Sequence, residues 1–372
     1  MLAQTLTLTD FRNVERAGVE LAPRLTFLVG DNAQGKTNAL EALAYALTLK
    51  PLRPARLGDL VRRGASTAVV DVSLTGPALP WQIHVEVEAG GRQVLVNGKL
   101  LRDPANLLGA VALVAFTPDD LALVKGAPEL RRRSLDRFVF QVQPGHLRHA
   151  RDYQRALRAR NLLLRRLDRD RRSLDAFGEM LAIAGARLMA GRHLGISLLR
   201  PALTRRHRQL APDGGELTID YRPALAGEEA AAGLDESAAS ERLRQALQEA
   251  LPLDLARRQT CRGPHLDDVE LALDGVPTRR FASQGQSRSI VLALRLAEAD
   301  ELRRARGEGP LLLADDLLAE LDDGRASALL TTLDAIGARV VATGTRLPPG
   351  LSAATAGCAI YSVRAGRLSR AN

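Results

Sequence analysis

Aromatic residues make up only 3% of this chain of 372 residues, and lysine occurs only at positions 36, 50, 99 and 125. Proteins that bind single-stranded nucleic acid usually stack its bases on aromatic rings, so the scarcity of rings argues against that mode of binding. Cysteine is scarce as well. Cys261 and Cys358 stand far apart and offer neither a disulfide framework nor the spacing of a zinc site. We therefore expect a protein of a reducing compartment.

Long apolar runs are also missing. The longest, around residues 107–116, is about half as long as a membrane-spanning helix needs to be. The N-terminal stretch alternates threonine and leucine from Thr5 to Thr9, without the basic and apolar regions of a signal peptide. These patterns predict a cytoplasmic protein without a membrane partner.

Positive charge, in contrast, is abundant. The formal net charge is +9, and 52 residues are lysine or arginine. Such an excess favours an anionic partner such as nucleic acid, and with so few aromatic rings we expect contacts to the backbone of duplex DNA. An arginine-rich composition without any DNA role remains the alternative.

A glycine-rich loop is the clearest motif. Residues 30–37 read Gly-Asp-Asn-Ala-Gln-Gly-Lys-Thr, the spacing of a phosphate-binding loop (P-loop), between the apolar run Leu25–Val29 and a helix-forming stretch. Its backbone N–H groups would hold polyphosphate, Lys36 would reach the β- and γ-phosphates, and Thr37 would bind Mg²⁺. A chance glycine-rich turn is the alternative. The predicted nucleotide-binding residues are Gly30, Asp31, Asn32, Ala33, Gln34, Gly35, Lys36, Thr37 and Asn38.

A second motif pairs two carboxylates with a buried strand. The apolar run Leu311–Ala314 ends in Asp315 and Asp316, as expected of a central parallel strand with a metal ligand at its tip. Asp315 would hold Mg²⁺, and Asp316 would accept a proton from the attacking water as a catalytic acid–base residue, together with Lys36 on the phosphates. A strand followed by an aspartate helix cap would look the same.

Upstream of this strand, residues 283–286 read Ser-Gln-Gly-Gln and lead into a helical pattern. Ser283 and Gln286 have the spacing of a capping box, which is the simpler interpretation. The same residues, about thirty positions before an apolar strand ending in two aspartates, match the signature of ABC-type ATPases. In that interpretation Ser283, Gln284, Gly285 and Gln286 face the γ-phosphate of ATP in a partner subunit, so that dimerisation becomes part of the chemistry.

The pattern along the chain predicts an α/β fold, an ABC-type P-loop ATPase head of mixed sheet and flanking helices, interrupted by a helical arm. Short strands dominate the first 115 residues, helical patterns run from about Asp119 to Leu210, and strands return from about Leu266. A loop is expected over Pro223–Glu236, followed by a helix that stops at Pro252. The predicted domains are residues 1–115 (head), 116–261 (arm) and 262–372 (head, with the signature and the paired aspartates).

Taken together, the motifs resemble the RecF family, bacterial ATPases of recombinational DNA repair related to the heads of SMC and Rad50 proteins. The matching segments run nearly end to end and occur in the family's order: Phe11–Asn13, Gly30–Asn38, Phe116–Leu121, Lys125–Pro128, Arg131–Asp136, Tyr153 with Arg160–Asn161, Gly263–Asp268, Ser283–Gln286 and Leu312–Asp322.

The resemblance implies a protein that binds ATP and Mg²⁺, forms an ATP-dependent homodimer on double-stranded and gapped DNA, and hydrolyses ATP slowly. It also implies RecO and RecR as partners, help in loading a recombinase at gapped or stalled DNA, and association with the nucleoid. By position, Gly30–Thr37 is Walker A, Asp315–Asp316 is Walker B, and Glu320 and Asp322 belong to the D-loop at the dimer interface. Leu266 stands where the family usually has arginine, and we assign no role to Thr117.

DNA contacts are predicted on the arm. On a helical wheel through residues 153–174, Arg158, Arg165, Arg169 and Arg172 share one face, which suits phosphate contacts that do not read sequence. A solvated face of an amphipathic helix is the alternative for each of them.

Two other functions fit parts of the sequence: a P-loop phosphotransferase, and an ABC ATP-binding subunit unrelated to DNA. A phosphotransferase does not explain Ser283–Gln286. The interval of about 250 residues from Gly30 to Ser283 is much longer than in ABC transport subunits.

Overall fold

The structure is a computed structural model that describes residues 2–76, 80–166, 170–225, 235–316, 323–347, 351–352 and 355–371. The chain divides into two compact units. The first contains Met1–Asp120 and Leu302–Asn372, and the second contains Leu121–Glu301. Each unit is described by itself.

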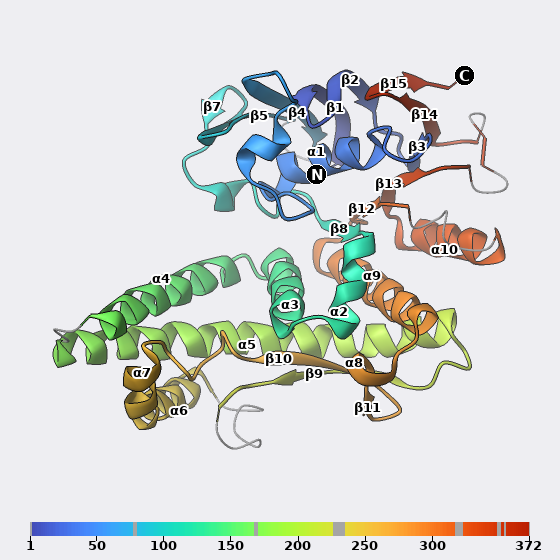
Figure 1. The fold of residues 1–372 in the computed structure, drawn as a ribbon. Helices are drawn as coiled ribbons and strands as arrows, with labels where there is room; N and C mark the ends of the chain where they lie inside the picture. The colour runs from blue at the N-terminus through green and yellow to red at the C-terminus, as the bar shows by residue number, and fades with distance from the viewer. Residues whose placement is uncertain are drawn as a thin grey trace. The chain divides into compact units, whose positions relative to one another are not determined.

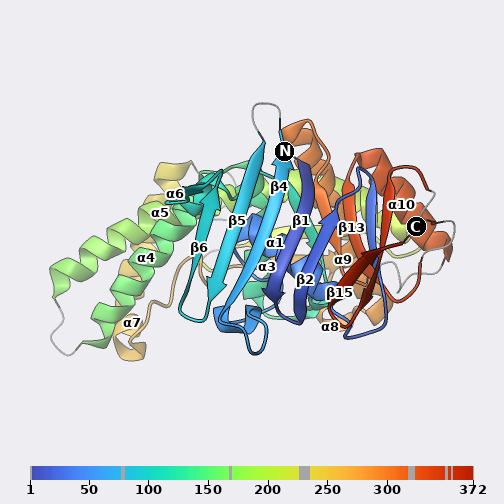
Figure 2. The same cartoon turned by 90° about the horizontal axis from the view of Figure 1, so that it is seen from above.

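The first unit contains an antiparallel sheet of six strands in the order β2-β1-β4-β5-β6-β7 (Figures 1 and 2). Buried and exposed residues alternate along its long strands, as in a sheet that covers a core with one face. The strands are β1 (Leu2–Phe11), β2 (Val14–Glu20), β4 (Thr67–Thr75), β5 (Trp81–Glu88), β6 (Gly91–Val96) and β7 (Lys99–Leu100).

The second sheet of this unit has the order β15-β14-β3-β13-β12-β8. Five strands are parallel and only β15 is antiparallel to its neighbour. Every residue of β8 and β12 is buried, because parallel strands are covered on both faces. The strands are β3 (Leu25–Val29), β8 (Leu113–Phe116), β12 (Leu311–Ala314), β13 (Arg339–Gly344), β14 (Cys358–Arg364) and β15 (Arg367–Arg370).

One hydrophobic core joins both sheets through helix α1 (Lys36–Thr48). Leu8 of β1, Leu43 of α1 and Val341 of β13 belong to the same buried cluster. Because α1 is apolar nearly all round, it is buried rather than amphipathic. The unit also contains α10 (Asp323–Ile336) and the short 3-10 helices η1 (Leu57–Leu60), η2 (Pro104–Asn106) and η3 (Pro118–Leu121), whose last residue belongs to the second unit.

The second unit is mainly helical. Its longest helix, α5, has 40 residues and therefore spans about 60 Å, with α4 beside it (Figure 1). A small sheet has the order β11-β10-β9. The elements are α2 (Ala122–Lys125), α3 (Pro128–Val142), α4 (His146–Arg165), α5 (Arg171–Leu210), β9 (Leu217–Arg222), α6 (Glu236–Glu249), α7 (Leu251–Arg257), β10 (Asp268–Leu273), β11 (Val276–Pro277), α8 (Thr278–Phe281) and α9 (Gln284–Arg306), whose last residues belong to the first unit.

Most predicted elements are present, but three expectations differ from the structure. The helical wheel through residues 153–174 assumed one helix, whereas α4 ends at Arg165 and α5 begins at Arg171, where the Asp170 side chain caps it. Pro252 does not stop a helix. It lies in the first turn of α7, where proline is tolerated because its missing N–H has no helical partner there. Strand β9 was not predicted at all. Of the expected loop Pro223–Glu236, residues 226–234 lie outside the described part of the chain.

The compact units also divide the chain differently from the expected domains 1–115, 116–261 and 262–372. Residues 262–301 fall in the second unit, because β10 pairs with β9 and α9 contacts α3 through Arg295 and Ser134. The expected functional domains stay a prediction.

Candidate functional site

The P-loop connects β3 to α1 in the strand–loop–helix order expected of it. Gly35 caps α1 in the left-handed region, with φ of 109°, and Ala33 is left-handed as well. A side chain at Gly35 would also meet Asn13, whose Oδ1 lies 2.6 Å from the position of an added Cβ. The left-handed backbone therefore favours glycine at this position, and a larger residue would also displace the Asn13 side chain.

Lys36 turns back over the loop instead of pointing into solvent. Its Nζ donates hydrogen bonds to the carbonyl oxygens of Gly30 (2.7 Å) and Asp31 (2.9 Å), and the residue is only 4% exposed. The loop thus holds a buried ammonium group through main-chain oxygens. Phosphate oxygens, which carry charge, are stronger acceptors for the same group.

Thr37 and Asp315 meet although 278 residues separate them. The Thr37 hydroxyl donates a 2.8 Å hydrogen bond to Asp315 Oδ1, and the Thr343 hydroxyl donates another of 2.8 Å to the same oxygen. Burial raises the pKa of Asp315; the two hydroxyl groups and Arg53 oppose this rise, and the neighbouring Asp316 adds to it. The parallel register places Asp315 here, because β12 pairs with β8 and β13 along its whole length.

These oxygen donors suit Mg²⁺, which prefers one or two carboxylates and completes its shell with water and substrate phosphates. Within the described residues, no group of three or more histidine, cysteine, aspartate or glutamate side chains could hold a metal ion. A hydroxyl, a carboxylate and bound phosphate would therefore have to share it. The residues present fit that arrangement.

Asp316 lies in a strained backbone conformation, with φ of 53°. Its N–H donates a 2.9 Å hydrogen bond to Thr343 Oγ1, so Thr343 touches both aspartates. Asp316 Oδ1 is buried and has no hydrogen-bond partner among the described residues. An acceptor left open next to a P-loop suits a group that takes a proton during a reaction.

A buried ion cluster supports the helix that follows the loop. Glu41 is fully buried and accepts hydrogen bonds from Arg12 and from Arg53. Arg53 also donates to Asn38 Oδ1 (2.9 Å), and Asn38 donates to Asn13 Oδ1 (2.8 Å). Sequence reasoning gave Glu41 and Arg53 no role. The only sequence signal is that Glu41 is an acidic residue within the apolar helix α1.

The predicted signature lies in the second unit, at the start of α9. The Ser283 N–H donates to Gln286 Oε1 (2.8 Å), and the Gln286 N–H donates to Ser283 Oγ (3.1 Å), so the capping-box interpretation is confirmed. Ser283, Gln284, Gly285 and Gln286 are all exposed. Their role toward a partner's nucleotide stays a prediction. The D-loop residues Glu320 and Asp322 lie outside the described residues.

The stretch Gly263–Asp268 forms part of the fold of the second unit. Tyr153 Oη and His265 Nδ1 are hydrogen-bonded at 2.7 Å, Arg131 pairs with Asp268, and Asp267 is 1% exposed. Leu266, in contrast, is 47% exposed. We find no ligand role for this stretch.

The predicted DNA-contact arginines do not lie on one helix. Arg158 and Arg165 are exposed on α4 and Arg172 is exposed on α5, whereas Arg169 lies outside the described residues. Their DNA contacts stay a prediction.

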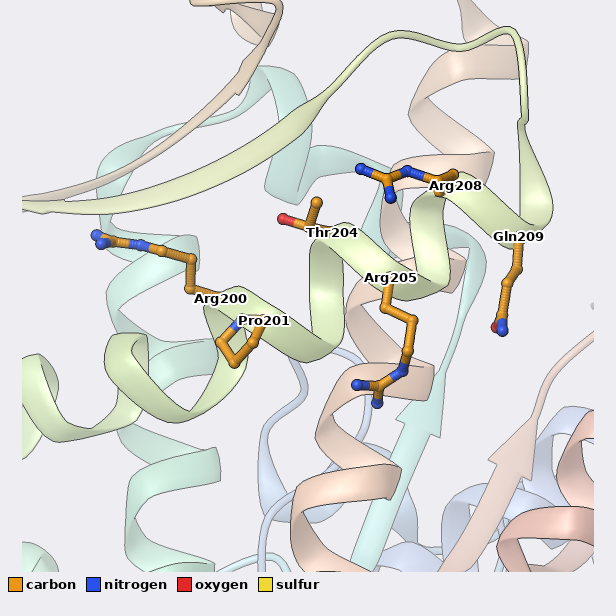
Figure 3. Close-up of a pocket in the computed structure, with 6 residues that line it drawn as sticks. All are labelled: Arg200, Pro201, Thr204, Arg205, Arg208 and Gln209. Atoms are coloured by element: carbon orange, nitrogen blue, oxygen red, sulfur yellow. The ribbon is translucent and has the colours of Figure 1, made fainter.

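A hollow of about 590 Å³ lies on α5 (Figure 3). Figure 3 shows its lining residues, all from this helix: Arg200, Pro201, Thr204, Arg205, Arg208 and Gln209. Arg200 pairs with Asp220 and Arg205 with Asp300. None of the six is a carboxylate or histidine that could act as a general base, so the hollow gives no support to a phosphotransferase acceptor site.

No helix in the described part of the chain is long and apolar enough to cross a membrane.

Comparison with known proteins places these features in context. Residues 2–343 match the family model for the RecF/RecN/SMC N-terminal domain. The DNA replication and repair protein RecF of Anaeromyxobacter sp. (strain Fw109-5) is 43% identical over 366 residues, which cover 98% of each chain. RecF of Myxococcus xanthus (strain DK1622) is 44% identical over 338 residues, which cover 90% of this chain and 88% of that protein.

Two solved structures of the recombination mediator protein RecF in the RecFOR pathway are similar over the whole chain. The one described as RecF-ATP has a TM-score of 0.91 and the one described as RecF-ATPrS a TM-score of 0.89, each at 26% identity and covering 98% of that chain. An Smc head bound to the C-terminal winged-helix domain of ScpA has a TM-score of 0.56 at 16% identity, covers 97% of that chain, and shares the fold. The predicted fold, an ABC-type ATPase head, is confirmed.

Proposed function

Because the chain belongs to the RecF family of DNA replication and repair proteins, we propose that it binds ATP at the P-loop and uses it to close a dimer on double-stranded DNA during recombinational repair. The observation that carries the proposal is the 2.8 Å hydrogen bond between Thr37 and Asp315. It joins the hydroxyl of the loop to the carboxylate at the tip of β12, beside the buried ammonium of Lys36. The similar RecF structures described with ATP support the choice of nucleotide.

The nucleotide is held by the main-chain N–H groups of the P-loop and by Lys36, which exchanges the carbonyl oxygens of Gly30 and Asp31 for phosphate oxygens. Thr37 and Asp315 would hold Mg²⁺, which would neutralise charge on the nucleotide phosphates when bound. Asp316 accepts the proton of the water that attacks the γ-phosphorus, while the bond to the β-phosphate oxygen breaks. It does so through Oδ1, the oxygen that has no partner among the residues that the structure describes.

A second copy of the chain completes the site. In the capping box, Ser283 Oγ accepts a hydrogen bond, so its hydroxyl hydrogen is free to be donated. The partner subunit's Ser283 donates that hydrogen to the γ-phosphate, with the backbone N–H of Gly285 of the partner subunit beside it. Capping and signature roles are therefore compatible. Hydrolysis, which we expect to be slow and stimulated by DNA, removes this link and opens the dimer.

DNA is the partner that fits the charge of the chain. A net charge of +9 and the arginines of α4 and α5 favour contacts with the phosphates of double-stranded and gapped DNA. As members of the same pathway, RecO and RecR are the proposed protein partners, and the outcome is help in loading a recombinase at gapped or stalled DNA.

The test is the mass of the protein in solution, measured by light scattering with and without saturating Mg-ATP. We expect the wild type to double from the 40.1 kDa of one chain only when Mg-ATP is present. Ser283→Arg places a bulky cation at the signature and should remain monomeric. Gln248→Arg, at an exposed position of α6, is the matched control and should dimerise like the wild type.

A wild type that stays monomeric with saturating Mg-ATP would contradict the composite site. Dimerisation of Ser283→Arg to the same extent as Gln248→Arg would place the interface elsewhere and remove the signature from the proposal.

A further inference from the structure

Two segments far apart in the sequence meet at the P-loop of the first unit: the turn between β1 and β2, and the tip of the C-terminal hairpin formed by β14 and β15. The Ala365 N–H donates a 2.7 Å hydrogen bond to the side-chain oxygen of Gln34. The Gly366 N–H donates another, of 2.8 Å, to the Gln34 carbonyl oxygen. Gln34 is therefore held by the hairpin through both its main chain and its side chain.

The hairpin also touches the loop and its neighbours by close packing. A Cβ at Gly366 would overlap the carbonyl of Asn13, and a Cβ at Gly30 would overlap the carbonyl of Val363 in β14. The side chain of Asn13 in turn lies against Gly35. Both ends of the P-loop are thus in contact with β14 or with residues that the hairpin tip fixes.

Gln34 needs such support because its neighbours are strained. Ala33 has φ of 63° and Gly35 has φ of 109°, so two left-handed residues flank it. A strained stretch keeps one conformation only when its surroundings hold it. Since the loop binds phosphate through its main-chain N–H groups, the orientation of these peptides decides how well it binds.

The tip of the hairpin is itself unusual. Ala365 (φ 48°) and Gly366 (φ 76°) form a two-residue turn with both central residues left-handed, the geometry that favours Asn-Gly or Asp-Gly. Asn97–Gly98, in the same unit, is a turn that follows the rule, and there Asn97 Oδ1 accepts a hydrogen bond from the Gln82 N–H. The side chain of Ala365 cannot make such a bond. Its N–H bonds to the P-loop instead, so the contact with Gln34 stabilises the strained turn.

From this geometry we propose that Gln34 is a positioning residue and that the C-terminal hairpin is a working part of the nucleotide site. The hairpin tip, through Gln34, holds the P-loop in the conformation that binds nucleotide phosphates. The inference rests on the proposed function, because it assumes that this loop binds ATP. It adds residues 363–366, about 330 positions from the loop, to the groups on which nucleotide affinity depends.

The experiment compares the affinity for a fluorescent ATP analogue with Mg²⁺, and the midpoint of thermal unfolding, among matched variants of the full chain. Gln34→Ala removes the acceptor of the Ala365 N–H and should weaken binding about fivefold to tenfold, the size of one lost hydrogen bond. Gly366→Ala should weaken binding at least as much, because the added Cβ forces the tip away from Asn13.

Gly98→Ala is the control. Its φ of 74° imposes the same backbone strain in the same unit, but nothing lies within 4 Å of the added Cβ. We expect a lower unfolding midpoint with unchanged affinity. Ala365→Asn keeps the N–H and suits the left-handed turn, so it should unfold at a slightly higher temperature than the wild type. The Gln34→Ala/Gly366→Ala double variant should bind the analogue no more weakly than whichever single variant has the lower affinity. Both substitutions act through the same contact, that between the hairpin tip and Gln34.

Lys36→Ala separates this inference from the proposed function. If the wild type binds the analogue no better than Lys36→Ala, both are overturned. If the wild type binds and Lys36→Ala does not, but Gln34→Ala binds as tightly as Gly98→Ala, only the role of the hairpin is overturned. If Gly366→Ala does not fold, Gln34→Ala decides the outcome alone.

Discussion

Two sets of carboxylates, one from each compact unit, have different surroundings. In the second unit, Asp136, Asp254 and Asp267 each have hydrogen bonds to both carboxylate oxygens. In the first unit, one buried oxygen of Asp316 has no partner among the described residues. A saturated ion network stabilises a fold, whereas an acceptor that is left open beside a P-loop is available for chemistry.

The pKa values follow the same contrast. Burial raises the pKa of Asp315, despite the hydroxyl groups of Thr37 and Thr343. Burial also acts to raise the pKa of Asp136, but the hydrogen bonds and charges of Arg192 and His146 outweigh it and lower this pKa to about 2. Substitutions at the paired aspartates of the first unit should therefore alter ATP turnover. Substitutions in the ion network around Asp136 should alter stability instead.

The largest effect is expected for Asp316→Asn. The amide keeps the shape but cannot accept the proton of the attacking water, so turnover should fall about 10²–10⁴-fold with little change in stability or ATP affinity. Phosphate release measures the turnover, and nucleotide titration measures the ATP affinity. Asp213→Asn, the same change at an exposed turn of the second unit, should have no effect. Turnover within threefold of the wild type would remove Asp316 from the mechanism.

Arg192→Met should produce the opposite pattern. Arg192 is 4% exposed and pairs with Asp136 and Asp267, so its loss removes the cation that these two carboxylates share. We expect the free energy of unfolding in urea to fall by about 3–5 kcal/mol, while the folded protein binds ATP normally. Arg187→Met, which breaks the exposed pair with Glu236, should cost no more than about 1 kcal/mol. Equal losses in both variants would contradict the role of the buried Arg192 network in stability.

Stability should depend on Asp136 at acidic pH. Its folded-state pKa of about 2 lies below the ordinary value of 3.8, so its stabilising effect is complete above pH 3.8 and disappears as the pH falls through about 2. We expect about 2 kcal/mol of stability to be lost over that window from this residue alone. Asp136→Asn should be less stable than the wild type at neutral pH, and its stability should change less with pH below pH 4. Parallel curves for both proteins would exclude this residue as the cause.

Thr343 tests whether the two aspartates are coupled. Thr343→Val keeps the shape but leaves the Asp316 N–H unpaired and removes one hydrogen bond from Asp315. Turnover should fall about tenfold, equivalent to roughly 1.4 kcal/mol. Thr343→Ser retains the hydroxyl and should recover most of the activity. A serine variant as slow as the valine variant would point to packing rather than to hydrogen bonding.

The smallest effect concerns the arginines of the second unit. Arg165→Glu with Arg172→Glu should weaken duplex binding and leave intrinsic ATP turnover intact. Each lost phosphate contact should lower the slope of log affinity against log salt by about 0.9. Identical salt slopes for variant and wild type would remove these positions from the DNA-binding surface.

Local patterns in the sequence predicted much of the first unit. The glycine spacing of the P-loop and the apolar run before Asp315 depend on neighbouring residues alone, and both predicted strands, β3 and β12, are present. The capping box at Ser283 is a local motif as well, and it forms. Such features are readable because the interactions that create them join residues a few positions apart.

The predictions of secondary structure were wrong where one local sequence pattern fits two different structures. Residues 153–174 keep a helical period, yet Asp170 caps a new helix by accepting hydrogen bonds from the N–H groups of Arg172 and Ser173. The aspartate was visible in the sequence, but a cap and a mid-helix aspartate look alike there. Strand β9 is short, and its pairing with β10 depends on residues about fifty positions away.

The sequence by itself determined that this chain carries a P-loop, paired aspartates after a buried strand, and a charge suited to nucleic acid. Only the tertiary structure decided that Thr343 bridges the aspartates, that Glu41 is held by two arginines, and that the C-terminal hairpin holds Gln34. The physical reason is that these partners are chosen by the register and order of strands in a sheet. Those depend on the packing of the whole core and leave no fixed spacing along the chain.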